Sequence, residues 1–85
     1  MKVLLQEWAI PGGGTSISRN RAEIRAAYKR VKRKIPWAKY NGGPTEINIP
    51  DDSVFAEMVA TRGTVFLSRD ETETAWDYYY KENPE

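Results

Sequence analysis

The residues best suited to chemistry in this sequence are arginines and lysines gathered between positions 19 and 39. Nine basic residues fall in this segment against a single acidic residue, Glu23. They are Arg19, Arg21, Arg25, Lys29, Arg30, Lys32, Arg33, Lys34 and Lys39. Guanidinium groups pair with phosphates in a bidentate manner, and several cations together bind a polyanion whatever its sequence. The segment therefore predicts contact with the phosphate backbone of a nucleic acid.

The remainder of the chain has the opposite charge. From Glu46 onward, ten acidic residues stand against Arg62, Arg69 and Lys81. The formal charge is therefore +8 for residues 19–39 (nine minus one) and −7 from Glu46 onward (three minus ten), whereas the whole chain carries only +1. Such segregation indicates either a surface that binds a polyanion or an internal pairing between the two halves. Internal pairing would exclude the nucleic-acid hypothesis.

A helix is expected to carry this basic segment. The apolar residues form one stripe at helical spacing, made of Ile24, Ala27, Tyr28, Val31 and Ile35. Pro36 ends the stripe, and Ser18 or Asn20 can cap its beginning. Asn20 with Glu23 three residues later resembles a capping box.

The cations divide between the two flanks of that stripe. At 100° per residue, one flank carries Arg21, Arg25, Lys29, Lys32 and Arg33, and the other carries Arg30 and Lys34. Like charges four residues apart cost a helix about 0.2–0.5 kcal/mol per pair, and the first flank repeats such pairs. An external anion is therefore expected to compensate the repulsion.

Two aromatic residues follow the basic segment. Trp37 and Tyr40 flank Lys39, and rings interleaved with cations are what stacking on unpaired bases requires. The competing interpretation is that Trp37 closes a small core. The predicted nucleic-acid-binding residues are Arg19, Arg21, Arg25, Lys29, Lys32, Arg33, Trp37, Lys39 and Tyr40. No zinc ligand set or heptad zipper accompanies them, so the pattern does not choose between DNA and RNA.

The run of glycines at positions 12–14 has two interpretations. A strand, a glycine-rich loop and then a helix is the layout in which backbone N–H groups receive an anion, so the loop can hold one phosphate. The loop lacks the lysine spacing of a P-loop and the G-x-G-x-x-G of a dinucleotide site. A flexible connector is therefore the preferred interpretation.

The C-terminal segment contains a second aromatic group. Tyr78, Tyr79 and Tyr80 cannot all face inward on a helix, so at least one ring is expected to be exposed. Aromatic rings beside acidic residues are typical of surfaces that bind proteins. The predicted protein-partner residues are Trp76, Tyr78 and Tyr80.

Catalysis is not expected of this chain. It contains neither histidine nor cysteine, which removes the commonest general base and the most accessible nucleophile. Asp51 with Asp52, and Asp70 with Glu71 and Glu73, are explained by the preference of helix N-termini for acidic residues rather than by a metal site. No enzyme, metal or cofactor is predicted.

The fold class predicted is α+β in a single domain, residues 1–85, with a short three-stranded sheet in the order β-α-β-α-β-α. Strands are expected at residues 2–10, 45–49 and 64–67. Helices are expected after Asn20, from Val54, and after Ser68, whose capping box includes Glu71. The alternative is β-α-β-β-α, with a hairpin around Arg62 and Gly63.

These features predict a small accessory or regulatory protein that binds DNA or RNA through a basic helix. The alternative is an inhibitor or adaptor that binds a protein, such as a phage-type inhibitor of a host nucleic-acid enzyme or defence complex. A homo-oligomer that joins basic to acidic faces is a third hypothesis. The apolar start of the chain is interrupted by Glu7 and is too short for a membrane span, so a cytoplasmic location is expected, in the host if the protein is viral.

Overall fold

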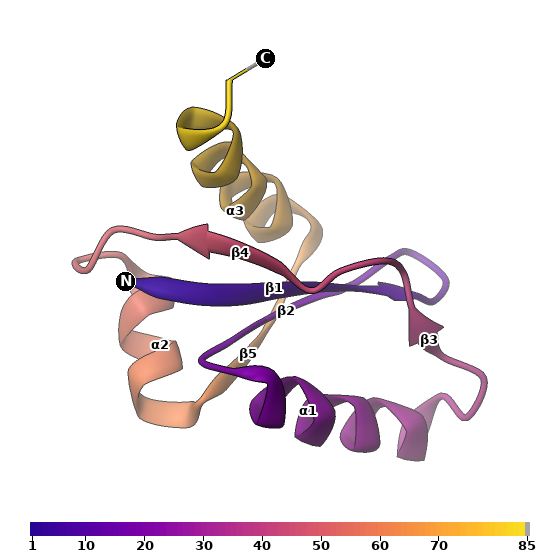
Figure 1. Cartoon of the computed structure of the whole chain (residues 1–85). Coiled ribbons are helices and arrows are strands. Elements are labelled where there is room, and N and C mark those ends of the chain that lie inside the picture. The colour runs from indigo at the N-terminus through magenta and orange to yellow at the C-terminus, as the bar shows by residue number, and fades with distance from the viewer. Residues whose placement is uncertain (85) are drawn as a thin grey trace.

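A five-stranded antiparallel sheet and three helices make up residues 1–84, which the computed structural model describes (Figure 1). In chain order the elements are β1 (Lys2–Ala9), β2 (Thr15–Ser18), α1 (Arg21–Lys34), β3 (Lys39–Tyr40), β4 (Thr45–Asn48), α2 (Val54–Arg62), β5 (Thr64–Leu67) and α3 (Arg69–Glu82). The sheet order is β3-β1-β2-β5, and β4 also pairs with β1. The α+β class is confirmed.

The sheet separates two cores of unequal size. Because side chains alternate along a strand, Val3 and Leu5 of β1 face one core, whereas Trp8 faces the other. The larger core also contains Ile17, Ile47, Val65 and Leu67 from the sheet, with Phe55 and Val59 from α2 and Ala75 from α3. The smaller core joins Trp8 to Ala27 and Val31 of α1 and to Ala38. Helices α1 and α3 consequently lie on opposite sides of the sheet (Figure 1).

The prediction of three strands was wrong, because β2 and β3 are also present. Strand β2 was not expected in the interior of the sheet, because three of its four residues are small and polar. It is buried because it pairs with β1 on one side and with β5 on the other. Two of its three hydroxyls form internal hydrogen bonds: Ser16 Oγ accepts from Trp8 Nε1 at 2.9 Å, and Ser18 Oγ donates to Thr64 Oγ1 at 3.0 Å.

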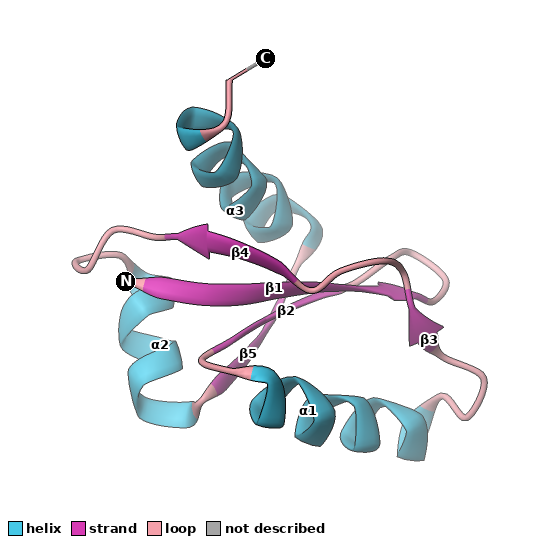
Figure 2. Cartoon of the chain, viewed as in Figure 1, coloured by secondary structure: helices cyan, strands magenta, loops and turns pink. Residues whose placement is uncertain are grey.

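Strands β3 and β4 follow one edge of β1 and are separated by a turn (Figure 2). Trp8 pairs with Tyr40, and Leu4 pairs with Glu46. Asparagine, glycine and proline, the residues of the turn between them, are typical of turns, and the buried Gln6 holds this turn by donating from Nε2 to the carbonyl oxygen of Gly42 at 2.7 Å. The result is that Tyr40 is placed beside Trp8 on the α1 side of the sheet.

The three helices begin where the sequence predicts. Asn20, Ser53 and Ser68 are the N-cap residues, and the complete capping box of α3 is present. At α1 the Asn20 side chain accepts from the backbone of Glu23, but the Glu23 carboxylate reaches Arg19 instead of completing a box. The hairpin alternative at residues 54–67 is wrong, because these residues form α2 and then β5.

Gly63 ends α2 in a conformation that favours glycine, with φ of 82°. A Cβ added there would lie 2.8 Å from a carboxylate oxygen of Glu23 and 2.9 Å from Nη2 of Arg19, so these two paired side chains would have to shift. Gly63→Ala is therefore expected to lower the free energy of unfolding, measured in urea, by about 1–2 kcal/mol or more. Gly12→Ala is the matched control, because its φ is 79° but an added Cβ meets nothing within 4 Å. An equal loss in both variants would show that the contact with Glu23 has no cost.

Candidate nucleic-acid interface

The outer side of α1 carries cations that no carboxylate neutralises within residues 1–84. The ion pairs in this part of the chain join Lys2 to Glu46, Arg19 to Glu23, and the amino group of Met1 to Asp51. None of them involves the helical cations Arg21, Arg25, Lys29, Arg30, Lys32, Arg33 and Lys34. The side chains of six of these seven residues are exposed, and Lys32 is half-buried. We call these seven residues the α1 cations.

The fold explains why the acidic helix α3 does not reach them. Helix α3, which carries Asp70, Glu71, Glu73, Asp77 and Glu82, packs on the opposite side of the sheet from α1 (Figure 1). The strands therefore stand between the cationic helix and the most acidic helix. In residues 1–84 no ion pair joins an α1 cation to a carboxylate of the acidic half, and such pairing would have excluded phosphate binding.

Aromatic rings line one flank of α1. The rings of Tyr28 and Tyr40 lie 4.7 Å apart between centroids, and both pack against Trp8. The Lys32 ammonium lies 5.4 Å from the centre of the Tyr28 ring, within the range of a cation–π contact. Burial raises the pKa of the Tyr40 phenol, Tyr28 adds to the rise, and the positive charge of Arg25 opposes it. Cations and rings thus share this flank.

The predicted residues at the start of α1 contribute less than the pattern implied. Arg19 Nη2 lies 2.8 Å from Glu23 Oε1, so this guanidinium is already paired. Arg21 borders a shallow hollow that also contains Glu46, a carboxylate on the same side of the sheet. The positive surface is consequently concentrated over the segment from Arg25 to Lys34.

The three predicted residues after α1 are all exposed. Trp37 does not close a core, because its side chain is 59% exposed in the connection between α1 and β3. Tyr40 is 42% exposed and packs with Trp8 and Tyr28, and we call these three rings the ring cluster. Lys39 is exposed beside Tyr40 in β3. The core interpretation of Trp37 is therefore wrong, because the rings that fill the α1 core come from Trp8 and Tyr28.

A groove on the other flank of α1 was not predicted. It is lined by Ile10, Val31, Ile35 and Phe66, with Arg30, Arg33 and Lys34 around it, and encloses about 480 Å³. Side chains alternate along β5, and Val65 and Leu67 both face the large core. This alternation indicates that the Phe66 ring between them points to the other side of the sheet, where it is exposed. The groove depends on β5 lying near α1, which no local pattern reveals.

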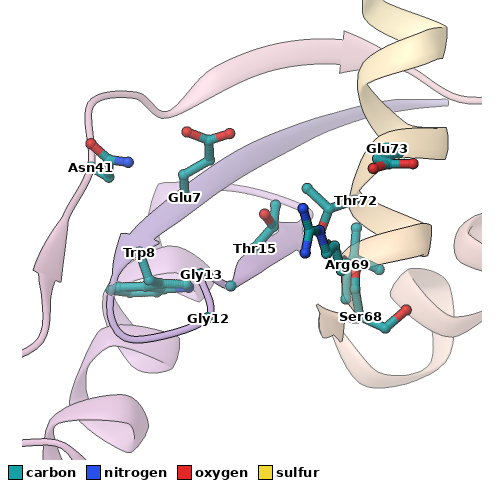
Figure 3. Close-up of a pocket in the computed structure, with 12 residues that line it drawn as sticks. Glu7, Trp8, Gly12, Gly13, Thr15, Asn41, Ser68, Arg69, Thr72 and Glu73 are labelled. Atoms are coloured by element: carbon teal, nitrogen blue, oxygen red, sulfur yellow. Dashed lines mark hydrogen bonds between the residues drawn. The ribbon is translucent and has the colours of Figure 1, made fainter.

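The glycine-rich loop does not lead into a helix, so the phosphate-binding layout, which was the less favoured of its two interpretations, is wrong. Residues 11–14 form the turn of the β1–β2 hairpin, and β2 separates this turn from α1. The loop instead borders a cleft of about 380 Å³ together with side chains from β1 and α3 (Figure 3). Glu7, Glu73 and Arg69 all line this cleft, which gives it a mixed charge.

Two of the three predicted protein-partner residues come together on α3. Trp76 and Tyr80 have ring centroids 5.9 Å apart and border a hollow with Glu7, Glu73 and Asp77. Trp76 Nε1 donates to Glu7 Oε1 at 2.9 Å, which fixes the indole against β1. Tyr80 is exposed, as predicted for at least one ring, whereas Tyr78 packs against the large core and does not join this hollow.

Comparison of the chain with protein-family models, with curated proteins and with solved structures gives no match. None of the helices in residues 1–84 has the length and the apolar run that crossing a membrane requires. In the same residues, no group of three or more acidic side chains is arranged to hold a metal ion. The functional argument therefore depends on the surface of the molecule.

Proposed function

We propose that this protein is a small accessory or regulatory protein that binds nucleic acid through the outer side of α1. The phosphates contact Arg21, Arg25, Lys29, Lys32 and Arg33, and Tyr40 lies at the edge of the contact. The observation that carries the proposal is that the α1 cations are accessible and unpaired among the described ion pairs, while the acidic helix lies across the sheet. The proposed setting is the cytoplasm, of a host cell if the protein is viral.

The dimensions of α1 suit a short stretch of phosphate backbone. From Arg21 to Arg33 the helix rises about 18 Å, at 1.5 Å per residue. One strand of a duplex carries a phosphate about every 3.4 Å of axis, so this length matches about five phosphates. The flank with Arg21, Arg25, Lys29, Lys32 and Arg33 offers five cations over that length. Charge number and span therefore agree.

A titration of fluorescently labelled oligonucleotides of unrelated sequences tests the proposal. At about 50 mM salt we expect micromolar or tighter binding, with affinities that differ little between sequences, because backbone contacts carry no sequence information. Fluorescence anisotropy measures the affinities. Absence of binding to every DNA and RNA oligonucleotide at this salt concentration would contradict the proposal.

A second candidate function is supported by the hollow on α3. Paired rings of Trp76 and Tyr80 beside three carboxylates suit a basic segment of a protein, as an inhibitor or adaptor would require. Capture from a nuclease-treated lysate with wild type and with Tyr80→Ala separates the two functions. A partner that survives nuclease and is lost with Tyr80→Ala favours the adaptor, whereas loss of all partners on nuclease treatment favours nucleic acid.

A further inference from the structure

The groove beside α1 combines an apolar floor with a cationic rim. Ile10, Val31, Ile35 and Phe66 form the floor, and Arg30, Arg33 and Lys34 lie around it. The three rim residues are exposed and take part in none of the ion pairs in residues 1–84. Two of them, Arg30 and Lys34, lie on the flank of α1 opposite Tyr28. The groove therefore extends the positive surface of α1 onto the β5 side of the molecule.

Phe66 presents an exposed ring on a rigid support. Its side chain is 48% exposed, and its ring is stacked on Trp8, with centroids 6.3 Å apart and planes 16° from parallel. Trp8 is itself only 2% exposed and is held by the hydrogen bond from its Nε1 to Ser16 Oγ. A ring fixed in this way loses little conformational freedom when a ligand packs on it. The support favours a planar ligand that stacks.

We infer that this groove receives unpaired bases, so that the protein binds single-stranded nucleic acid more tightly than duplex. The inference rests on the proposed function and names its ligand more narrowly. Phosphates complement Arg30, Arg33 and Lys34, and the faces of bases complement the apolar floor with Phe66. A duplex hides its base faces in the stack, so it can use the cations but not the floor. An acidic amphipathic peptide is the competing occupant.

The test compares a single-stranded oligonucleotide with the duplex of the same sequence and length at one salt concentration. The wild type is expected to bind the single strand at least about five-fold more tightly. Phe66→Ala is expected to weaken single-strand binding about ten-fold, in line with the loss of one stacked base, and to change duplex binding less than about two-fold. Thermal melting of each variant shows that it remains folded at the temperature of the titration.

Two further variants separate stacking from general apolar contact. Phe66→Tyr keeps the ring and is expected to retain the single-strand affinity, whereas Phe66→Leu keeps apolar bulk and is expected to lose it. Val54→Ala is the control for an exposed apolar residue, because Val54 is 66% exposed on α2 and does not line the groove. Its binding of both ligands should match the wild type.

Three results would overturn the inference. Equal wild-type affinity for single strand and duplex, with no effect of Phe66→Ala, would leave the proposed function intact and remove the preference for unpaired bases. A Phe66→Leu variant that binds the single strand like the wild type, while an acidic amphipathic peptide competes for the groove, would assign it to a protein. Failure of both nucleic acids to bind would remove the proposed function, and the inference with it.

Discussion

Arg25→Glu combined with Lys29→Glu is expected to weaken binding of every oligonucleotide by about 100-fold at about 0.1 M salt. Two lost phosphate contacts account for a factor of about 60 at this salt concentration, and the repulsion of the introduced carboxylates adds to it. Both residues are exposed in the middle of α1, where the described ion pairs leave them free. Fluorescence anisotropy with duplex and single-stranded ligands measures the change.

The helix is expected to tolerate this double reversal. Glutamates at positions 25 and 29 would lie four residues from Arg21 and Arg33, which replaces two of the three repulsive pairs by attractive ones and leaves positions 25 and 29 alike in charge. The control is Arg62→Glu with Lys81→Glu, which makes the same change in net charge on exposed residues of α2 and α3. We expect the control to change affinity less than about three-fold. An equal loss in both double variants would show that only the net charge matters, and the role assigned to α1 would be wrong.

Trp8→Ala is expected to lower the free energy of unfolding by about 3–5 kcal/mol, as is usual for a buried tryptophan. Trp8 is 2% exposed and contacts the rings of Tyr28, Tyr40 and Phe66. Its loss would leave a cavity under α1 and remove the hydrogen bond to Ser16 Oγ, whose buried hydroxyl would lose its partner. Urea denaturation followed by circular dichroism measures the change.

Trp37→Ala is the matched control, since Trp37 has the same side chain at 59% exposure. It is expected to change the free energy of unfolding by less than about 1 kcal/mol, because substitutions of exposed residues usually cost little. If Trp37→Ala proved more destabilising than Trp8→Ala, the placement of the two indoles, and with it the support of the ring cluster, would be wrong.

The sequence predicted α1 well because its determinants are local. Asn20 at the cap, an apolar stripe at helical spacing and Pro36 after the last turn all act within a few residues of one another. The N-cap of α3 at Ser68 was predicted from a local pattern in the same way, and its capping box is present. Hydrogen bonds from the Ser68 backbone and side chain in this box hold the pKa of the Glu71 carboxyl below its ordinary value.

Strand β2 and the groove could not be predicted because they depend on distant parts of the chain. Ser16 and Ser18 are unremarkable in sequence, and they are buried only because β1 and β5 pair on either side of them. Likewise, Phe66 borders a groove because β5 lies near α1. Because β2 pairs with β1, the glycine-rich loop between them is a hairpin turn and does not lead into a helix.

The separation of charge across the sheet is the feature on which the proposed function depends most. The +8 and −7 segments of the sequence were compatible with mutual neutralisation, and the linear pattern alone did not exclude it. Packing α1 and α3 on opposite sides of β1 and β2 keeps five of the ten carboxylates of the acidic segment, those of α3, away from α1. The strength of the proposed phosphate contact is then expected to depend on how many α1 cations a ligand reaches at once.

The dependence of duplex affinity on salt concentration counts those contacts directly. A duplex is the suitable ligand, because its stacked bases exclude the apolar groove from the measurement. With about five phosphates neutralised, the slope of log K against log salt concentration is expected to be roughly −4 to −5 for the wild type. The slope for Arg25→Glu with Lys29→Glu should be less steep by about 2. A wild-type slope near zero would contradict the account.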